Sequence, residues 1–342
     1  MCLYPRLIKN PKYKRNIKNG GVIPPVFDKR QQFVPVGCQT CIECRKQKAR
    51  AWQMRLMEDI KEHRNGKFVT LTFSTKSLIE LSQLEGVLGK EGYDLDNAIV
   101  TVAVRRFLER WRKKYKRSVR HWLVTELGHG DSEHIHLHGI IWFDDAKEIE
   151  KIWQYGFVWK GYERNDGSVE NYVNGKTVNY IIKYLNKIDT DHLNYKSIVL
   201  CSPGIGQCYD TSGRIRVNKY KPGRTDEAYR TESGHKIGLP IYWRNKIYSD
   251  RERELLWLEK LDKNERFVCG ERVSIENEEE EEEYYKLVSY HRRRTEALGY
   301  PKPDFIWKKK KYEEERRAML HKERLGIHSP ASPEKYEGVH ET

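Results

Sequence analysis

Apolar positions recur along this chain with two periods, one typical of strands and one typical of helices. Three segments alternate or are rich in β-branched and aromatic side chains, which predicts strands at residues 68–73, 120–126 and 134–143. Three others repeat their apolar positions at helical spacing, which predicts helices at residues 45–63, 95–117 and 176–188. A short helix near 145–153 and a strand near 156–162 complete the pattern. Asp94 or Asp96 is the expected N-cap of the second long helix.

The order of these elements predicts the fold class. Gly, Asp and Ser in residues 127–133 are typical of a hairpin connection between two strands. Hairpin-paired strands interspersed with helices predict an α+β fold, with an antiparallel sheet covered by helices on one face. We expect three regions: a basic N-terminal arm with a cysteine cluster and a basic helix (1–65), a central domain (66–250) and a charged, helical or disordered C-terminal extension (251–342).

Charge indicates the kind of partner. The formal net charge is +14 and the sequence pI is about 9.3. Residues 1–60 alone hold 13 Lys and Arg against 4 Asp and Glu. Such an excess favours a polyanionic partner, nucleic acid before an anionic membrane surface. The chain has neither an apolar run of about 18 residues nor the apolar block of a secretory signal, so we expect a soluble intracellular protein without a membrane partner.

Three histidines occur at period two in the strand at 134–143. Residues at this spacing point to one face of a strand, so His134, His136 and His138 would lie side by side. A carboxylate could complete a metal site with them, either Glu126 at the end of the preceding strand or Glu133. Imidazole and carboxylate ligands suit Mn²⁺ better than Mg²⁺, although the abundance of Mg²⁺ keeps it open. The alternative is a solvent-facing surface that is rich in histidine.

The helix at 176–188 carries two pairs at helical spacing. Tyr180 and Tyr184 lie four residues apart, as do Lys183 and Lys187, so each pair shares a face one turn apart. An amphipathic helix with buried aromatic residues would explain this spacing. A site that handles phosphate would explain both pairs.

The cysteines leave several interpretations open. Cys38, Cys41 and Cys44 form a C-x₂-C-x₂-C run, and Cys2 is available as a fourth thiolate. Four cysteines could hold a structural Zn²⁺ and tie the arm to the basic helix. An iron–sulfur cluster or free thiols in a reducing cytoplasm are the alternatives.

Basic and aromatic residues interleave in the two long helices that precede the histidine strand. Such mixtures suit single-stranded DNA, because cations follow the phosphates and aromatic rings stack on bases. Solvated helix faces explain each segment as well when it is taken singly. The residues that we expect to bind DNA are Arg45, Lys46, Lys48, Arg50, Arg105, Arg106 and Lys113.

These motifs together resemble those of a known family. His136-Leu137-His138 followed by Gly-Ile-Ile-Trp resembles the metal-binding motif of the HUH endonucleases. YIIKYLNK (180–187) closely resembles the two-tyrosine motif Y-x-x-K-Y-x-x-K of rolling-circle replication initiators from small single-stranded DNA phages. MCLYPRLI at the start, the cysteine run and SPGIG (202–206) look like the gokushovirus branch of the microviruses. The matches keep the expected order over about residues 1–250.

The resemblance implies a fold and a set of ligands. Residues 66–250 would be an HUH nicking domain, related to the ferredoxin fold. The metal ligands would be His136, His138 and Glu126, with His134 and Glu133 as alternates. The family's Gly-Glu-x-Gly element appears here as Thr-Glu-Leu-Gly (125–128), which supports Glu126. The family usually shows Arg-Pro before the histidine pair, where this chain has His134 and Ile135.

The resemblance also implies an activity, a metal-dependent endonuclease and strand transferase. Attack by a tyrosine on single-stranded origin DNA would leave a 5′-phosphotyrosyl link and a free 3′-OH. The second tyrosine would cut the regenerated origin, and joining would release circular DNA. Because no Walker-type motif is present, a host helicase and a host polymerase are the expected partners, in the cytoplasm of a bacterial host. The alternatives are a non-catalytic, zinc-containing accessory protein that binds nucleic acid and a metal-dependent nuclease that uses water.

Overall fold

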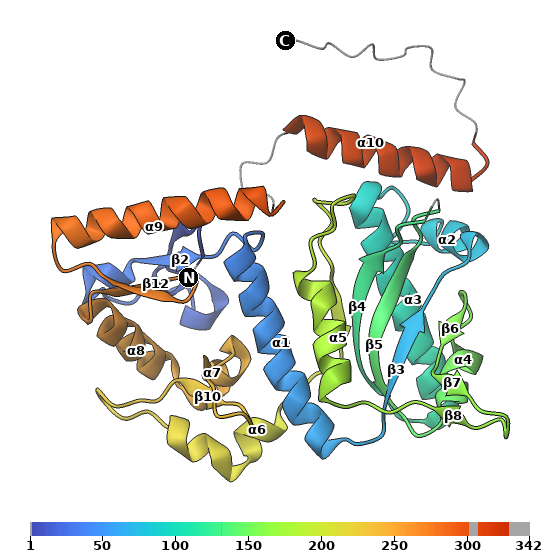
Figure 1. The fold of residues 1–342 in the computed structure, drawn as a ribbon, viewed down its shortest axis with the longest axis horizontal. Helices are drawn as coiled ribbons and strands as arrows, with labels where there is room; N and C mark the ends of the chain where they lie inside the picture. Colours follow the sequence, from blue (N-terminus) through green and yellow to red (C-terminus); the bar gives the residue numbers. More distant parts are fainter. Residues whose placement is uncertain (1, 131, 301–306, 328–342) are drawn as a thin grey trace.

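The computed structural model describes residues 2–130, 132–300 and 307–327, with side chains of the last segment from residue 314 onward. Residues 328–342 of the predicted C-terminal extension lie outside the described residues. A five-stranded antiparallel sheet with strand order β6-β3-β5-β4-β9 occupies one half of the molecule (Figure 1). Its strands are β3 (Gly66–Leu71), β4 (Arg120–Leu127), β5 (Ile135–Trp142), β6 (Val158–Trp159) and β9 (Val199–Cys201).

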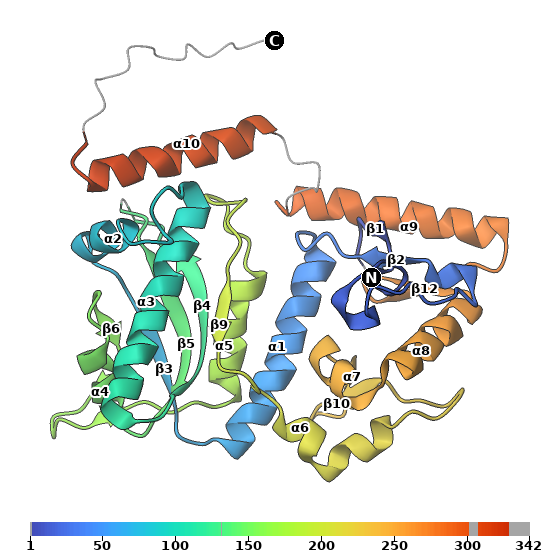
Figure 2. The ribbon, with the colours of Figure 1, turned by 180° about the vertical axis from the view of Figure 1, so that it is seen from behind.

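One face of this sheet packs on a layer of helices. The alternating residues Leu71, Leu137 and Ile141 point to this face and form a core with Ile99 and Phe107. Figure 2 shows the long helix across this side of the sheet. The helices of this layer are α2 (Thr75–Ser82), α3 (Gly92–Tyr115) and α4 (Ala146–Ile152). The predicted α+β class, with its antiparallel sheet and a helical layer, is confirmed.

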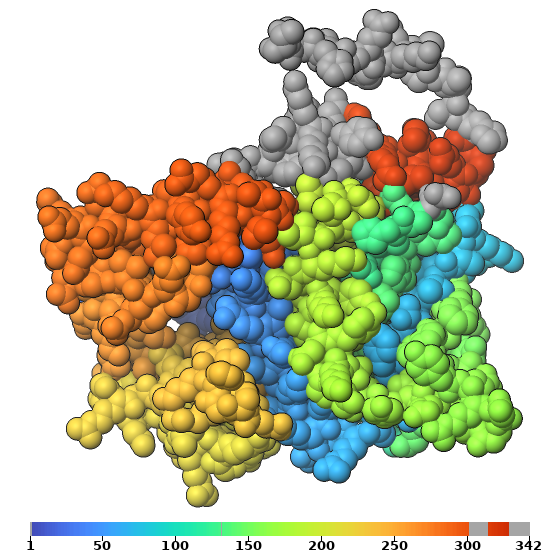
Figure 3. All heavy atoms as spheres, viewed as in Figure 1, coloured from blue at the N-terminus to red at the C-terminus, as the bar shows by residue number. Residues whose placement is uncertain are grey.

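The other face of the sheet also carries a helical layer, so the expectation that helices cover one face only is wrong. Trp122 and Ile140 point to this face and pack against Leu56 and Ile181. These two apolar residues come from α1 (Ile42–Glu62) and α5 (Gly175–Asn186). Helices therefore cover both faces, because β4 and β5 carry apolar residues on both sides over part of their length. Figure 3 shows α1, in blue, between α5 and the C-terminal elements.

Gly139 allows the two central strands to approach closely. It pairs with Leu123 of β4 and follows directly after His138. A Cβ atom added at Gly139 would lie only 2.0 Å from the carbonyl oxygen of Trp122. A larger residue here would push β5 away from β4 and separate the polar residues that the two strands bring together.

The remaining elements form short hairpins and helices around two smaller cores, one at Trp243 and one at Leu3. The antiparallel pairs are β1 (Arg6–Lys9) with β2 (Phe33–Val36), β7 (Tyr162–Glu163) with β8 (Val169–Glu170), β10 (Ala228–Arg230) with β11 (Lys236–Gly238), and β12 (Glu265–Val268) with β13 (Glu271–Ser274). The helices are α6 (Cys208–Thr211), α7 (Ile241–Ile247), α8 (Asp250–Asp262), α9 (Glu278–Ala297) and α10 (Trp307–Arg324). Single 3₁₀ turns occur at Pro11–Tyr13, Ile17–Asn19, Lys29–Gln31 and Gly213–Asn218.

The charged C-terminal part is helical, as predicted, and it packs on distant parts of the chain. The six glutamates at 278–283 open α9, where negative charge complements the helix dipole. Val288 of α9 packs with Leu3 of the arm. Farther on, α10 crosses the N-terminal end of α3 (Figures 1 and 2). No helix in the described part of the chain is long and apolar enough to cross a membrane.

The expected N-cap of α3 is wrong. The helix begins at Gly92 with Glu91 as its N-cap, so Asp94 and Asp96 lie inside its first turns. The carboxylate of Asp96 is buried and forms a 2.8 Å ion pair with Arg317 of α10. A partner 221 residues away, which local spacing cannot show, holds this aspartate in the helix.

Candidate active site

The pairing register of β4 and β5 brings three polar side chains together. Glu126 lies directly opposite His136, and His138 lies two residues farther along β5. Because side chains alternate along a strand, all three project from the sheet face that α1 and α5 cover. Ile135 and Leu137 point into the opposite core, as the period-two pattern predicts. We call Glu126, His136 and His138 the histidine–glutamate group.

The ligand atoms of this group converge. Nε2 of His136 lies 3.2 Å and Nε2 of His138 lies 3.0 Å from Oε2 of Glu126. Nδ1 of His138 lies 3.0 Å from the Thr70 hydroxyl, and Nδ1 of His136 lies 3.2 Å from the carbonyl oxygen of His134. A partner at Nδ1 fixes each ring and leaves Nε2 as the metal-facing nitrogen. The donor set and the ring orientations therefore fit a divalent cation.

The protonation states in the group also suit metal binding. Burial acts to raise the pKa of the Glu126 carboxyl, but hydrogen bonds from His136, His138 and Lys187 outweigh it and lower this pKa. Burial lowers the pKa of His138, against the opposing effect of its hydrogen bond to Glu126. At neutral pH the group thus offers a carboxylate and, at His138, a neutral imidazole, which are the forms that bind a metal ion.

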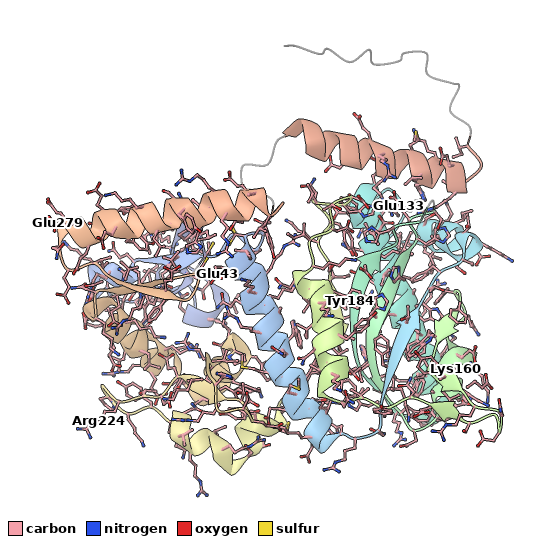
Figure 4. The ribbon with its side chains drawn as sticks, viewed as in Figure 1. Glu43, Glu133, Lys160, Tyr184, Arg224 and Glu279 are labelled. Atoms are coloured by element: carbon pink, nitrogen blue, oxygen red, sulfur yellow. The ribbon has the colours of Figure 1, made fainter. Side chains whose placement is uncertain are left out.

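The tyrosine helix begins at a defined cap and buries one face. The side chain of Asn174 accepts from the backbone N–H of Thr177, and the Thr177 hydroxyl accepts from the N–H of Asn174. Val178, Ile181 and Leu185 are buried against the sheet. This packing fixes the rotation of α5, so that Tyr184 projects toward β4 and β5 (Figure 4).

The two phenols meet over the histidine–glutamate group. The Tyr184 ring stacks on the His138 ring, with centroids 4.1 Å apart and planes inclined by 2°. The Tyr184 hydroxyl donates to the Tyr180 hydroxyl at 2.8 Å. Tyr180 packs edge-on against Phe68 and is 47% exposed. A phosphodiester entering from solvent would therefore meet both hydroxyls beside the candidate metal ligands.

The two lysines of the helix take different positions. Nζ of Lys187 lies 3.1 Å from Oε1 of Glu126, whereas Nζ of Lys183 lies 5.8 Å from the centroid of the Tyr180 ring. Burial raises the pKa of Tyr184, and the hydrogen bond to Tyr180 and the charge of Glu126 raise it further. Without an added positive charge, the Tyr184 hydroxyl therefore stays protonated.

The two alternates lie outside the group. Nδ1 of His134 lies 3.1 Å from the carbonyl oxygen of Phe73, and its Nε2 lies 3.4 Å from the Thr75 hydroxyl. Glu133 is buried and pairs with His192 at 2.9 Å and with Arg317 at 3.0 Å. The structure therefore brings Glu126 together with His136 and His138, and with neither alternate.

Two features of the site carried no readable signal in the sequence. Thr70 holds His138, which requires that β3 pair with β5. Another set of possible ligands lies beyond Lys187, whose Nζ is 3.4 Å from Nε2 of His129. It consists of His129, Asp189 and His192, and we call it the third cluster. Both features depend on strand order and on the loop after α5, neither of which a local pattern specifies.

The four N-terminal cysteines meet at the start of α1. The ligand atoms of Cys2, Cys38, Cys41 and Cys44 all lie within 4.8 Å of one another. Backbone N–H groups donate to the sulfur of Cys2 from Tyr4 at 3.3 Å and from Cys38 at 3.2 Å. A third N–H, that of Cys41, donates to the sulfur of Cys38 at 3.3 Å. We call these four residues the cysteine group.

Hydrogen bonds within the cysteine group shift the pKa values of its thiols in opposite directions. Hydrogen bonds from Cys41 and Cys44 lower the pKa of the Cys38 thiol, and the same bonds raise the pKa of the other two thiols. A Cβ at the neighbouring Gly37 would lie 2.9 Å from the Cys44 sulfur, so the chain wraps closely around the group. Four converging sulfurs in a close wrap, two of which accept backbone N–H bonds, fit a tetrahedral metal site.

The expected DNA-binding residues fall on both sides of the sheet. Arg45 and Lys48, on α1, line a pocket that also contains Tyr184. Lys46 and Arg50 are exposed on the same helix but do not line this pocket. The remaining three are exposed on α3, in the helical layer on the opposite face from the tyrosines: Arg105, Arg106 and Lys113.

Fold and site together define a mixed α/β protein with a candidate metal centre beneath a pair of tyrosines. Residues 66–189 match the sequence model of a family described as replication-associated proteins of the ORF2 type. The match runs from β3 past the end of α5, so it contains the histidine–glutamate group and both tyrosines. No curated protein and no solved structure matches the chain. The family similarity supports a role in replication.

Proposed function

We propose that this protein is a replication initiator that nicks single-stranded origin DNA through a tyrosine and later rejoins the ends. One observation carries the proposal: the Tyr184 ring lies flat on His138, and its hydroxyl is 2.8 Å from that of Tyr180. Both candidate nucleophiles, Tyr180 and Tyr184, thus lie beside the candidate metal ligands. The similarity of residues 66–189 to a replication-associated family supports the biological setting.

His136, His138 and Glu126 would hold the divalent cation. When bound, the cation would polarise the scissile phosphate and offset its negative charge. Two imidazoles and one carboxylate favour Mn²⁺. Mg²⁺ prefers oxygen ligands, but it is the alternative because it is abundant. Thr70 keeps His138 turned toward the phosphate, since it holds the far nitrogen of that ring.

The first step exchanges one phosphodiester for another. The phenolic oxygen of one tyrosine forms a bond to phosphorus, and the bond from phosphorus to the 3′-oxygen breaks. The phenol loses its proton and the leaving 3′-oxygen gains one, which yields a 5′-phosphotyrosyl link and a free 3′-OH. Lys183, near the Tyr180 ring, and Lys187, beside Glu126, would stabilise the charge that develops on the phosphate.

The second tyrosine accounts for termination. After one round of synthesis the protein is still joined to the 5′ end, and the regenerated origin has to be cut again. With its hydroxyl 2.8 Å away, the other tyrosine can attack at the same place. The new 3′-OH then attacks the first phosphotyrosine and releases a circle. We further propose that a host polymerase extends the 3′-OH and that a host helicase separates the strands, in the cytoplasm of a bacterial host.

The test uses end-labelled single-stranded DNA with a candidate origin, incubated with Mn²⁺ or Mg²⁺. The product is run on a denaturing protein gel beside the Tyr180→Phe/Tyr184→Phe double variant. Tyr285→Phe/Tyr290→Phe is the matched control, because both tyrosines are exposed on α9, in the other half of the molecule from the group. We expect a label that migrates with wild-type protein, requires metal, persists in the control and disappears in the double variant.

Two other outcomes would overturn this proposal. Cleavage without attached label, unchanged in the double variant, would indicate a nuclease that uses water. Tight DNA binding that needs no added metal, with neither cleavage nor adduct on any strand of the replicating genome, would indicate an accessory protein that binds nucleic acid.

We also propose that the cysteine group holds a structural Zn²⁺. A tetrahedral zinc with Zn–S bonds of about 2.3 Å needs sulfurs roughly 3.8 Å apart. The sulfurs of Cys2 and Cys41 lie 3.9 Å apart. The test is the metal content of purified protein, with Cys44→Ser compared with Cys208→Ser, a cysteine outside the group. We expect one zinc per chain in wild type and Cys208→Ser, and loss of zinc in Cys44→Ser. Wild-type protein without bound metal would overturn the assignment.

A further inference from the structure

A small basic pocket opens beside the tyrosine pair. It has a volume of about 130 Å³ and lies between the N-terminal end of α1 and the loop that follows α5. Arg45, Lys48 and Lys196 line it together with Tyr184 and Glu126. One wall of the pocket is thus the candidate nucleophile, and the other walls carry cations from two distant parts of the chain.

The acidic residues of the pocket are already paired. Glu126 bonds to Lys187 and to the two histidines of its group, and Asp189 bonds to His192 at 2.9 Å. Among the described residues, no carboxylate lies within ion-pair distance of Arg45, Lys48 or Lys196. The pocket therefore holds a surplus of positive charge.

The cations are held toward the pocket by neutral partners. A guanidinium nitrogen of Arg45 donates to the carbonyl oxygen of Lys187 at 3.2 Å, and Nζ of Lys48 donates to that of Ser197 at 3.4 Å. Two cations that line one pocket and lack a carboxylate partner favour an anionic ligand.

We propose that this pocket binds a backbone phosphate of the DNA strand next to the scissile one. The inference rests on the proposed function, because it takes the ligand to be the strand that Tyr184 attacks. A strand that crosses the tyrosines would pass one phosphate over the histidine–glutamate group and a neighbouring phosphate into the pocket. Arg45 and Lys48 would then fix the position of the strand relative to the nucleophile.

The same helix supplies a matched control. Lys46 and Arg50 lie on α1 within five residues of Arg45, carry the same charges and do not line the pocket. Arg45→Gln/Lys48→Gln and Lys46→Gln/Arg50→Gln therefore remove equal charge from the same helix. Any difference in DNA affinity between the two pairs is therefore due to the pocket and not to the net charge of the protein.

The experiment measures affinity for a single-stranded oligonucleotide over a range of salt concentrations, without added divalent metal. All proteins carry Tyr180→Phe/Tyr184→Phe, so that binding is measured apart from nicking. We expect the pocket pair to weaken binding roughly tenfold and to reduce the slope of log affinity against log salt by about 0.7, the value for one phosphate that the protein no longer neutralises. The control pair should change the slope by less than half as much.

Equal effects of the two pairs, or none from the pocket pair, would overturn the proposal. If the pocket pair lowers the melting temperature, Lys48→Gln alone replaces it, because the Lys48 side chain is exposed and its loss leaves the fold intact. The expected reduction in slope is then smaller than about 0.7, because Arg45 still faces the phosphate. The pocket pair could weaken binding although the protein with its two tyrosines restored forms no covalent adduct. That result would support the phosphate pocket and reject the proposed nicking.

Discussion

The two candidate metal centres differ in their surroundings as well as in their ligands. The histidine–glutamate group is in contact with Tyr184 and Lys187, and a basic pocket opens beside it. The cysteine group is wrapped by its own backbone, with three N–H groups donating to sulfur, and it packs among Leu3 and Val288. Structural metal sites are closed, whereas catalytic sites keep a position open for substrate. The neighbours of each group therefore indicate chemistry at the first and stability at the second.

The largest effect expected from this difference is on nicking. His136→Ala removes one ligand of the histidine–glutamate group, and the loss of metal-assisted charge stabilisation should slow nicking roughly 10³-fold. His134→Ala is the matched control, because that side chain precedes the same strand but lies outside the group. Rates come from the time course of labelled adduct at saturating DNA. Comparable losses in both variants, or nicking by His136→Ala within tenfold of wild type, would contradict the role of this group.

Much of this site could be predicted from the sequence, because it depends on short periods. The alternation of His136 and His138 with apolar residues gives their shared face, and the four-residue spacing of Tyr180 and Tyr184 gives theirs. The hairpin between β4 and β5 then makes Glu126 an available neighbour of the histidines. Each of these relations spans only a few residues or one hairpin.

Relations between distant segments could not be predicted in this way. Its place beside the histidines in the sequence makes Glu133 an alternate ligand in the prediction. In the structure its carboxylate accepts a hydrogen bond from Arg317, 184 residues away. Lys187 reaches Glu126 only because α5 packs on the same face of the sheet as the histidines. Local spacing fixes which residues share a face, and tertiary packing decides which partners meet them.

The next largest effect is on stability and comes from the cysteine group. Cys44→Ser removes one thiolate, and the loss of a structural zinc should lower the free energy of unfolding by about 3 kcal/mol or more. Cys208→Ser should cost less, because that thiol only donates a hydrogen bond to the carbonyl oxygen of Glu58. Urea unfolding monitored by circular dichroism gives both values. A Cys44→Ser protein as stable as wild type would show that the cysteine group does not hold the arm to α1.

The smallest effect concerns the third cluster, His129, Asp189 and His192, whose ligand atoms also lie within 4.8 Å of one another. His192 is buried, and both of its ring nitrogens already face carboxylates, Asp189 and Glu133, each at 2.9 Å. We therefore expect this cluster to act as a charged pair and not as a metal centre. Burial acts to lower the pKa of His192, but the hydrogen bonds to the two carboxylates outweigh it and raise this pKa.

The sign of the pH dependence follows from the raised pKa of His192. The folded protein holds the His192 proton more tightly than the unfolded chain does, so the stabilisation is complete below the ordinary value of 6.5. It is lost as the pH rises through the raised pKa. The loss should be about 1.5–3 kcal/mol, the size of a hydrogen bond to a charged group. His192→Gln keeps a polar side chain but cannot titrate, so its unfolding free energy should fall less than that of wild type between about pH 6 and pH 9. His235→Gln, at an exposed histidine, should follow wild type. If Zn²⁺ or Mn²⁺ instead stabilised wild type but not His192→Gln, the third cluster would be a metal centre. The protein would then have a third metal site beside the histidine–glutamate group and the cysteine group.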